Sequence, residues 1–261
     1  MKYAIVNLGC KVNAFEAEAV SEMLSNNGHT RVSFDEQPDA TIVFTCAVTN
    51  TAAAKSRKIL HQAKRIKEDE ITALVGCYVQ VNDGLLEEAD ILVGSANKKK
   101  LPQYIEQYLK NHEKIRDIAS LENVPFDSFT SSVHDSKARC DLKIQDGCNQ
   151  FCSYCIIPYA RGRERSMEPD LVVAEAKRLS KKYKEIVLTG IHTGRYGKEY
   201  NITLTDIIRR ILTETEDVRI RISSIEITEV SDALIQLMKE NDRMTKFLHI
   251  PLQSGCDSVL K

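Results

Sequence analysis

The chain has 261 residues, with 43% hydrophobic and 28% charged residues and a formal net charge of −1. This length and composition predict a soluble globular protein with one large or two medium domains, and no apolar run approaches the roughly 20 residues that cross a membrane. The near-zero charge excludes a protein that is polycationic throughout, so a nucleic-acid partner would have to bind local patches or another domain.

The first half of the chain alternates expected strands and helices. Strands are predicted at 2–8, 29–34, 40–45, 71–76 and 90–93, and helical segments at 14–26, 51–67, 85–89 and 101–111. Such alternation with short links predicts an open parallel sheet covered on both faces, of the Rossmann or flavodoxin-like kind.

Three cysteines follow three different predicted strands in this half. Cys10, Cys46 and Cys77 each lie at or just past the carboxyl end of a strand, two of them in Gly-Cys pairs. In an open parallel sheet these ends share one edge, where ligands bind. Cysteines are also common buried residues that can end strands by chance. Three such placements out of three favour a metal site.

The region 113–137 has no firm periodicity, apart from a short edge strand expected at 115–118. Ser, Asp and Pro cluster from 123 to 136, which predicts a linker. We therefore expect an N-terminal α/β domain over 1–122, a linker over 123–137 and a second domain over 138–261.

The second half is expected to form a partial (β/α) barrel. Strands are predicted at 139–145, 185–189, 219–223 and 247–251, and helices at 169–182, 204–213 and 231–240. Consecutive parallel strands need crossover helices, which this order supplies. Four strands do not close a barrel, so we expect this domain to be incomplete at its C-terminus.

A cysteine motif opens the second domain. Cys148, Cys152 and Cys155 have the spacing C-x3-C-x2-C on a loop that leaves the first predicted strand of this domain. Three thiolates complete neither a tetrahedral zinc site nor a four-cysteine cluster. An iron–sulfur cluster with one open position, a zinc site with a ligand from elsewhere and three unrelated thiols remain as alternatives, of which the spacing favours the cluster.

Further polar residues follow the motif. The loop that follows the cysteines is rich in arginine. A guanidinium matches phosphate and carboxylate groups, so this loop is a candidate substrate-binding loop, although a solvated charged loop is an alternative. The predicted strand ends supply other candidates. The arginines are Arg161, Arg163 and Arg165, and the strand-end residues are Gly190, His192, Ser223, Glu226 and Gln253.

The motif and its surroundings resemble a known family. The string GCNQFCSYCIIPYARGRERS, with Tyr154 just before the last cysteine, resembles radical S-adenosylmethionine methylthiotransferases. The resemblance implies that Cys148, Cys152 and Cys155 hold a [4Fe-4S] cluster. The amino and carboxylate groups of S-adenosylmethionine would chelate its fourth iron. It also implies that cofactor contacts come from Tyr154 and from the strand-end residues, with the loop at Gly190 receiving the methionine amino group.

The N-terminal cysteine motifs carry the same resemblance. LGCKVNAFEAE, FTCAVTN and VGCY resemble the three motifs that hold a second [4Fe-4S] cluster in this family. Members often have Asn-Thr-Cys where this chain has Phe44-Thr45-Cys46. Because the cysteine is kept, we expect two clusters, the second on Cys10, Cys46 and Cys77.

The resemblance implies an activity as well. The strings LGCKVN, ARGRERS, RISSIE and HIPLQSG are most similar to the branch that adds a methylthio group at C2 of N6-threonylcarbamoyladenosine at tRNA position 37. The other branches modify isopentenyladenosine in tRNA or an aspartate of a ribosomal protein. The expected partners are tRNA and an electron donor of the flavodoxin or ferredoxin type, and the sequence does not define the sulfur donor. The family core has six strands and a small RNA-binding β-barrel after them, so we expect this chain to be part of a longer protein.

Two other protein classes remain as alternatives: a non-catalytic zinc protein that binds RNA and an electron-transfer protein with two clusters. The second needs a fourth cysteine at each cluster. Only Cys140, inside a predicted strand, and Cys256, past the last one, are spare, and both are interpreted as structural thiols. Eight cysteines without a secretory signal predict a reducing cytoplasmic location and no membrane association.

Overall fold

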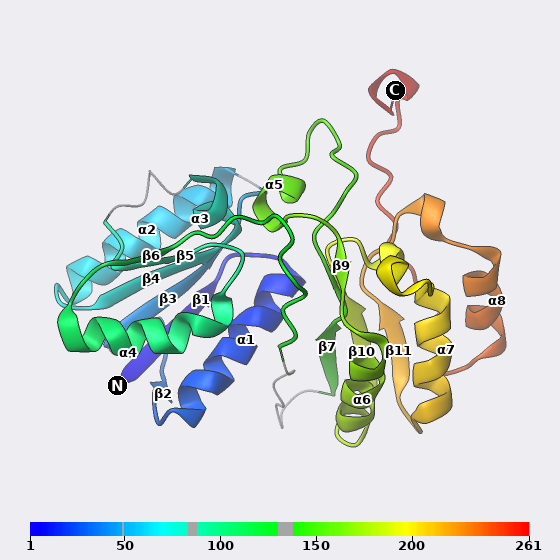
Figure 1. Cartoon of the computed structure of the whole chain (residues 1–261), viewed down its shortest axis with the longest axis horizontal. Helices are drawn as coiled ribbons and strands as arrows, with labels where there is room; N and C mark the ends of the chain where they lie inside the picture. The colour runs from blue at the N-terminus through cyan, green and yellow to red at the C-terminus, as the bar shows by residue number, and fades with distance from the viewer. Residues whose placement is uncertain (49, 83–87, 130–137, 261) are drawn as a thin grey trace. The chain divides into compact units, whose positions relative to one another are not determined.

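The structure is a computed structural model, which describes the chain except for residues 49, 83–87, 130–137 and 261. It divides into two compact units, and each is described by itself (Figure 1). Unit 1 comprises Met1–Ser132 and Gly147–Arg163, and unit 2 comprises Val133–Asp146 and Glu164–Lys261. The loop with the C-x3-C-x2-C motif therefore packs with the N-terminal unit, although it lies past the expected linker in the sequence.

Unit 1 is built on a six-stranded sheet in which every neighbouring pair is parallel, as expected. Its order is β2-β1-β3-β4-β5-β6. The strands are β1 (Lys2–Asn7), β2 (Thr30–Arg31), β3 (Ala40–Thr45), β4 (Ile71–Gly76), β5 (Ile91–Val93) and β6 (Ile115–Asp117). Every residue of β3 and β4 is buried, because helices cover both faces of the sheet.

The two faces of this sheet have separate cores. Phe15 and Leu24 of α1 and Ile105 of α4 pack on one face, and Leu60 of α2 and Val79 of α3 pack on the other. Figure 1 shows α2 and α3 above the sheet and α1 and α4 below it. These helices are α1 (Lys11–Asn26), α2 (Asn50–Ile66), α3 (Cys77–Asn82) and α4 (Leu101–Asn111).

Two local expectations for unit 1 change. The strand predicted at 29–34 is only two residues long, because Ser33 and Glu36 form a capping box that starts the 3-10 turn η1 (Phe34–Glu36). Helix α3 was not predicted, since its six residues are too few to show a helical period. The turn expected at 85–89 lies largely outside the described residues. The remaining short helices of unit 1 are η3 (Lys98–Lys100) and α5 (Ile157–Arg161).

The strand order places a topological switch point between β1 and β3. From this point the chain continues to β2 on one side and to β4 and β5 on the other. In open α/β sheets the ligand crevice lies at the carboxyl ends of the strands at such a point. The register aligns Asn7 with Phe44 and Thr45 with Gly76, so β1, β3 and β4 end at nearly the same level.

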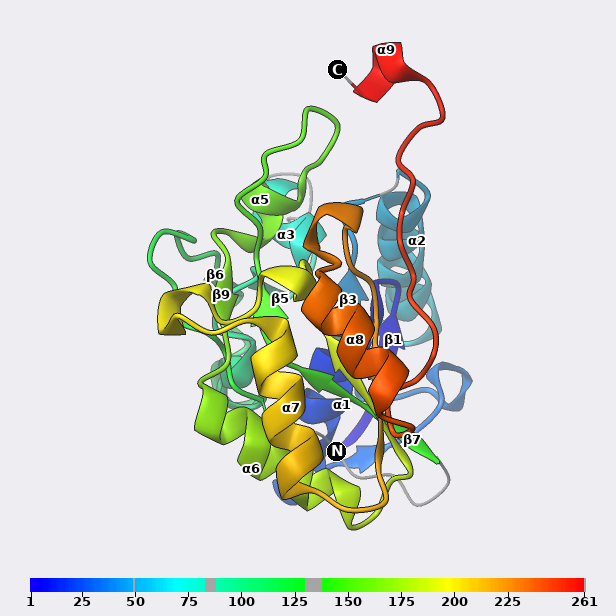
Figure 2. The same ribbon diagram turned by 90° about the vertical axis from the view of Figure 1, so that its right-hand side faces the viewer.

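Unit 2 contains a three-stranded parallel sheet in the order β11-β10-β7. Figure 2 shows its three longer helices side by side, each following its strand in the chain. Side chains of Glu168, Thr203 and Ser231 cap their N-termini. The strands are β7 (Arg139–Lys143), β10 (Glu185–Thr189) and β11 (Arg219–Ile222), and the helices are α6 (Pro169–Ser180), α7 (Leu204–Glu214) and α8 (Asp232–Glu240).

Shorter elements complete unit 2. The antiparallel pair β8 (Gln145–Asp146) and β9 (Arg165–Ser166) flanks the cysteine loop in the sequence. The others are the 3-10 turns η4 (Thr193–Arg195), η5 (Lys198–Tyr200) and η6 (Ile227–Glu229) and the helix α9 (Asp257–Leu260).

The fourth strand predicted for this domain, at 247–251, is wrong. The segment has no strand, and only a bridge from Ile220 to Met244 and the bond from the Ile225 N–H to the His249 carbonyl extend the sheet past β11. Its apolar pattern resembles a strand, but Phe247 is 51% exposed, and Pro251 has no N–H to donate.

The class is α/β, as expected, with a six-stranded parallel sheet before the second domain. None of the described helices is both long and apolar enough to cross a membrane.

Candidate functional site

Cys10, Cys46 and Cys77 follow three adjacent strands of unit 1. Cys10 is the N-cap of α1 just after β1, Cys46 comes directly after β3, and Cys77 is the first residue of α3 after β4. The pKa of the Cys46 thiol is raised above its ordinary value, chiefly by burial. The Val48 N–H and Arg161 lower this pKa, and the nearby Cys77 and Cys10 thiols raise it further. The three thiols are therefore close enough to interact electrostatically.

The residues of this edge do not form a compact single-ion site. Within the described ranges, no three Cys, His, Asp or Glu side chains surround one metal position. A zinc ion needs its ligands about 2.0–2.3 Å from one point, whereas each cysteine of a four-iron cluster binds a different iron and lies farther from the next.

Hydrogen bonds tie the three strand ends together beside the cysteines. The Asn13 side-chain amide donates to the Thr45 carbonyl over 2.8 Å. The Thr45 hydroxyl donates to the Val75 carbonyl over 2.8 Å and accepts the Tyr78 N–H over 3.3 Å. Sequence reasoning missed Asn13 and Thr45, because their partners lie about 30 residues away.

Arg161, at the end of α5, lies in the same network. Its side chain is fully buried, its Nε donates to Cys77 Sγ over 3.1 Å, and its Nη1 pairs with Glu16 Oε1 at 2.9 Å. Its Nη2 also donates to the Asn13 side-chain oxygen. Glu16 pairs in turn with the buried Lys98 at 2.7 Å. The guanidinium thus has two functions here, as an ion-pair partner and as a donor to a cysteine sulfur.

This placement revises the expectation that Arg161 binds substrate. A residue in the substrate-binding loop should present its guanidinium to solvent, and that of Arg161 is occupied by groups within unit 1. Arg165 is also mostly buried and pairs with Asp146 at 3.2 Å within unit 2. Arg163 is exposed, 4.7 Å above the Phe151 ring, and remains the candidate for a phosphate or carboxylate.

The C-x3-C-x2-C loop closes tightly on itself. The Cys148 N–H donates to the Gly162 carbonyl over 3.1 Å, and the Cys155 N–H donates to the Cys152 carbonyl over 2.9 Å. Gly147 has φ +70°, and a Cβ there would lie 2.0 Å from the Arg163 carbonyl oxygen, so only glycine fits.

The thiols of this loop are more accessible than the buried Cys77. Cys152 is exposed, and Cys148 and Cys155 are partly exposed. Tyr154, between two of the cysteines, is 70% exposed.

In unit 2, the strand-end candidates occupy one edge of the sheet. Gly190 directly follows β10, Ser223 directly follows β11, and the Ser223 hydroxyl lies 3.4 Å from that of Thr193. His192 is buried. Its backbone N–H donates to Gln145 Oε1 over 2.7 Å, and its ring Nε2 lies 2.8 Å from Glu229 Oε1.

Of the other two candidates of unit 2, Gln253 is exposed and Glu226 is partly exposed. The Gln253 amide donates to Glu226 Oε1 over 3.3 Å. Sequence reasoning missed Glu229, because nothing in the local pattern pairs it with His192 across 37 residues.

Both halves of the chain match known families. Residues 2–94 match "Uncharacterized protein family UPF0004", and residues 142–261 match "Radical SAM superfamily". Cys10, Cys46 and Cys77 lie in the first match, and the C-x3-C-x2-C motif lies in the second. The radical SAM family implies a [4Fe-4S] cluster and S-adenosylmethionine.

Similar proteins align along nearly the whole chain. "Threonylcarbamoyladenosine tRNA methylthiotransferase MtaB" of Bacillus subtilis is 39% identical over 99% of this chain and 59% of its own length. The protein of the same name from Aquifex aeolicus is 34% identical over 100% of this chain and 65% of its own. "tRNA-2-methylthio-N(6)-dimethylallyladenosine synthase" of Desulforamulus reducens is 31% identical over 99% of this chain and 59% of its own.

The chain thus spans 59–65% of the length of these curated relatives. The matched region of this chain, 99–100% of its length, includes the N-terminal parallel sheet and the radical SAM domain. With this domain order, the chain is similar along nearly its whole length to radical S-adenosylmethionine methylthiotransferases, and residues 142–261 match the radical SAM superfamily.

Proposed function

We propose that the protein adds a methylthio group to C2 of N6-threonylcarbamoyladenosine at position 37 of tRNA. The observation that carries this proposal is the presence of two separate cysteine trios, three residues on adjacent strand ends and three on one loop, in a single compact unit. The name of the relative with 39% identity supports the substrate.

Cys148, Cys152 and Cys155 would hold the cluster that binds S-adenosylmethionine. Thiolates are the ligands that iron–sulfur clusters prefer, and three of them leave one iron for a cosubstrate. The exposure of Cys152 and Tyr154 fits this assignment, because a cosubstrate must reach the loop.

Cys10, Cys46 and Cys77 would hold the second cluster. Cys77 already accepts a hydrogen bond from the cationic Arg161, so a positively charged group lies directly beside this sulfur. The three residues follow the strand ends at which open α/β sheets bind ligands. The donor set and its surroundings therefore fit a cluster.

The C2–H bond of adenine resists ordinary acids and bases. When bound, the cofactors would supply the radical that activates this bond, the sulfur and the methyl group. The protein's part is to hold and orient the reactants. Gly190, His192, Ser223, Glu226 and Gln253 are the candidates for S-adenosylmethionine contacts at the strand ends of unit 2.

Two arrangements support such a binding role. The bond from the His192 N–H to Gln145 and the contact of its ring with Glu229 hold the loop after β10 in place. Arg163, stacked on Phe151, would bind a phosphate of the RNA. A redox protein would supply electrons, and the source of sulfur is open.

A related substrate has support of its own. Relatives named for dimethylallyladenosine are 31–32% identical over nearly the whole chain, against 33–39% for the listed relatives named for threonylcarbamoyladenosine. The second candidate is therefore methylthiolation of the isopentenyl-type adenosine in tRNA.

Nucleoside analysis of tRNA tests both candidates. Cells lacking the gene are compared with cells that carry it again, and with cells that carry the Cys148→Ser variant. We expect the methylthio derivative of threonylcarbamoyladenosine to disappear, to return with the wild-type gene and to stay absent with the variant. Persistence of this derivative in the deletion strain would reject the assignment, and loss of only the isopentenyl derivative would favour the second candidate.

A further inference from the structure

Helix α2 carries an unusual concentration of positive charge. Between Asn50 and Ile66 it has five cations, from three lysines and two arginines, and no acidic residue. The whole chain has a net charge of −1, so the rest of the chain sums to −6 (−1 minus 5). One helix therefore has a charge opposite to that of the remaining protein. The cations are Lys55, Arg57, Lys58, Lys64 and Arg65.

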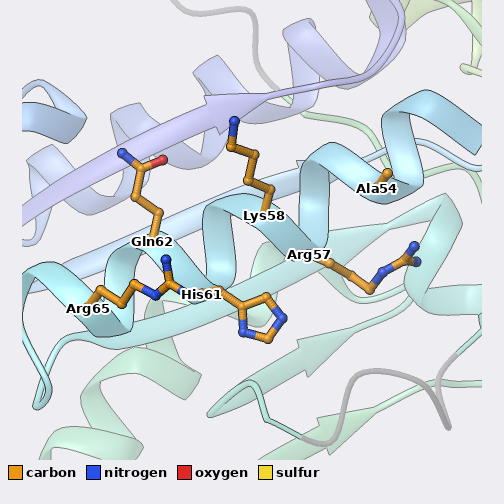
Figure 3. A pocket seen from close by; sticks show the side chains of 6 residues that line it. All are labelled: Ala54, Arg57, Lys58, His61, Gln62 and Arg65. Atoms are coloured by element: carbon orange, nitrogen blue, oxygen red, sulfur yellow. The ribbon is translucent and has the colours of Figure 1, made fainter.

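Most of these side chains face outward along a groove on the helix surface. Figure 3 shows Arg57, His61 and Arg65 in one row and Lys58 and Gln62 in a second. Residues four apart are neighbours on a helix, so each row presents a polar group about every 6 Å, over about 12 Å from Arg57 to Arg65.

The ion pairs within unit 1 leave this face positive. Lys64 turns toward the sheet, where it pairs with Asp90 at 2.7 Å. Lys58 and Arg65 are exposed and have no acidic partner among the described residues. His61 lies 3.2 Å from Glu88, but both are more than half exposed, and such a pair is weak.

We propose that this face of α2 binds the phosphate backbone of the tRNA substrate. The inference rests on the proposed function and adds a location for RNA binding. Lys, Arg and Gln side chains are the groups that contact phosphates. Cations spread in rows along 12 Å suit a linear polyanion better than a single anion, which needs them to converge.

The composition of the groove argues against an acidic protein as the occupant. Among the described residues its lining is Ala54, Gln62, His61 and three cations, without a Phe, Tyr, Trp, methionine or branched aliphatic side chain. Binding energy at protein interfaces is concentrated in buried Trp, Tyr and Arg side chains, and the described lining of this face supplies only the arginines.

The surface is also adjacent to the candidate cluster of unit 1. Helix α2 begins four residues after Cys46. The Arg57 guanidinium donates to the Tyr78 hydroxyl over 2.5 Å and lies over the Tyr78 ring, and Tyr78 directly follows Cys77. RNA bound along α2 would therefore extend toward the cysteines that are proposed to supply sulfur.

The test compares two double variants of the full chain with its clusters loaded. Lys58→Gln with Arg65→Gln removes the two exposed cations of the groove. Lys110→Gln with Lys181→Gln removes the same charge from exposed helix ends elsewhere. Fluorescence anisotropy measures binding of tRNA that carries N6-threonylcarbamoyladenosine at 50 and 200 mM salt.

We expect the groove variant to bind about tenfold more weakly at the lower salt. Its salt dependence should fall by about 1.5 in log–log slope, because each lost phosphate contact removes about 0.7–0.9. The control variant should bind within about twofold of wild type. Equal affinity and slope for both variants would overturn the proposal, as would unchanged tRNA binding together with weaker binding of an acidic flavodoxin.

Methylthiolation assays separate this inference from the proposed function. If the chain modifies the tRNA and the groove variant has an unchanged KM for it, the surface assignment fails and the function stands. If α2 proves necessary for tRNA binding but the chain leaves C2 unmodified, the function fails and the surface stands.

Discussion

The two cysteine trios of unit 1 are built in opposite ways. Cys148, Cys152 and Cys155 lie on one loop. A hydrogen bond from the Cys148 backbone N–H to the Gly162 carbonyl joins the ends of this loop. Cys10, Cys46 and Cys77 come from three turns that are 31 to 67 residues apart in the chain. Each trio has one exposed cysteine, Cys152 or Cys10, but only the strand-end trio has a buried one, Cys77, which lies against Arg161.

The difference shows how each site depends on the rest of the fold. The loop trio needs only a short segment with the right turns, which suits a site open to a cosubstrate. The strand-end trio exists only when β1, β3 and β4 are in register and Asn13, Thr45 and Arg161 hold their ends. We expect local changes to damage the first site and changes in buried polar contacts to damage the second.

Removal of one cysteine from each trio should give the largest and most distinct effects. We expect about eight irons in the loaded chain and about four in both Cys148→Ser and Cys10→Ser, since each cluster has four. Cys148→Ser should abolish cleavage of S-adenosylmethionine, whereas Cys10→Ser should keep cleavage and lose methylthiolation. Iron analysis and quantification of 5′-deoxyadenosine measure these outcomes.

The exposed Cys256 provides the control for this comparison. Cys256→Ser should keep all the iron and the cleavage activity. A Cys10→Ser chain with a full complement of iron would show that the strand-end trio holds no cluster.

The buried ion pairs at the strand-end site predict a large loss of stability. Glu16→Gln would leave Arg161 and Lys98 buried without their carboxylate, which we expect to lower the free energy of unfolding by about 3–5 kcal/mol. Glu18→Gln on the same helix removes only a partly exposed pair with Arg31 and should cost at most about 1 kcal/mol. Urea unfolding of the metal-free chain measures both, and equal losses would contradict the role of Glu16.

A pair of glycine variants tests the loop site. In Gly147→Ala the new Cβ would meet the Arg163 carbonyl oxygen, so we expect the loop to open and the chain to lose about four irons. Gly28→Ala has a similar φ of +83° but nothing within 4 Å, so it should cost about 1 kcal/mol and keep its iron. Normal iron content in Gly147→Ala would show that this close approach is dispensable.

The smallest effect concerns the acid just after the loop. The Arg195 guanidinium holds the pKa of the Glu164 carboxyl below its ordinary value, so this pair stabilises unit 2 at neutral pH and loses its contribution as the pH falls through the lowered pKa. Glu164→Gln should reduce the free energy of unfolding by about 1 kcal/mol at pH 7 and by less at pH 4.

Urea unfolding of the metal-free chain at the two pH values measures this change. Glu216→Gln, at an exposed site of the same unit, is the control and should show little change at either pH. An equal loss for Glu164→Gln at both pH values would show that its charge does not contribute.

Local signals in the sequence predicted much of the architecture. The apolar runs at 40–45 and 71–76 match β3 and β4, and the helical periods match α1, α2 and α4 closely. These predictions succeed because strand and helix periods reflect burial against neighbours that any α/β sheet supplies. The strand predicted at 247–251 failed because an apolar pattern does not by itself form the hydrogen bonds of a sheet, and the described segment makes one bond to it, from the Ile225 N–H to the His249 carbonyl.

The sequence by itself determined the alternation of strands and helices, the spacing of the loop cysteines and the positions of three more cysteines after strands, since all of these follow from contacts between residues near one another in the chain. Only the tertiary structure decided that Arg161 meets Glu16 and Cys77, that Lys98 shares the same carboxylate, and that the cysteine loop packs with the N-terminal unit. Those pairings join residues 82 to 145 positions apart, and the free energy of burying a charge with its partner leaves no periodic trace in the sequence.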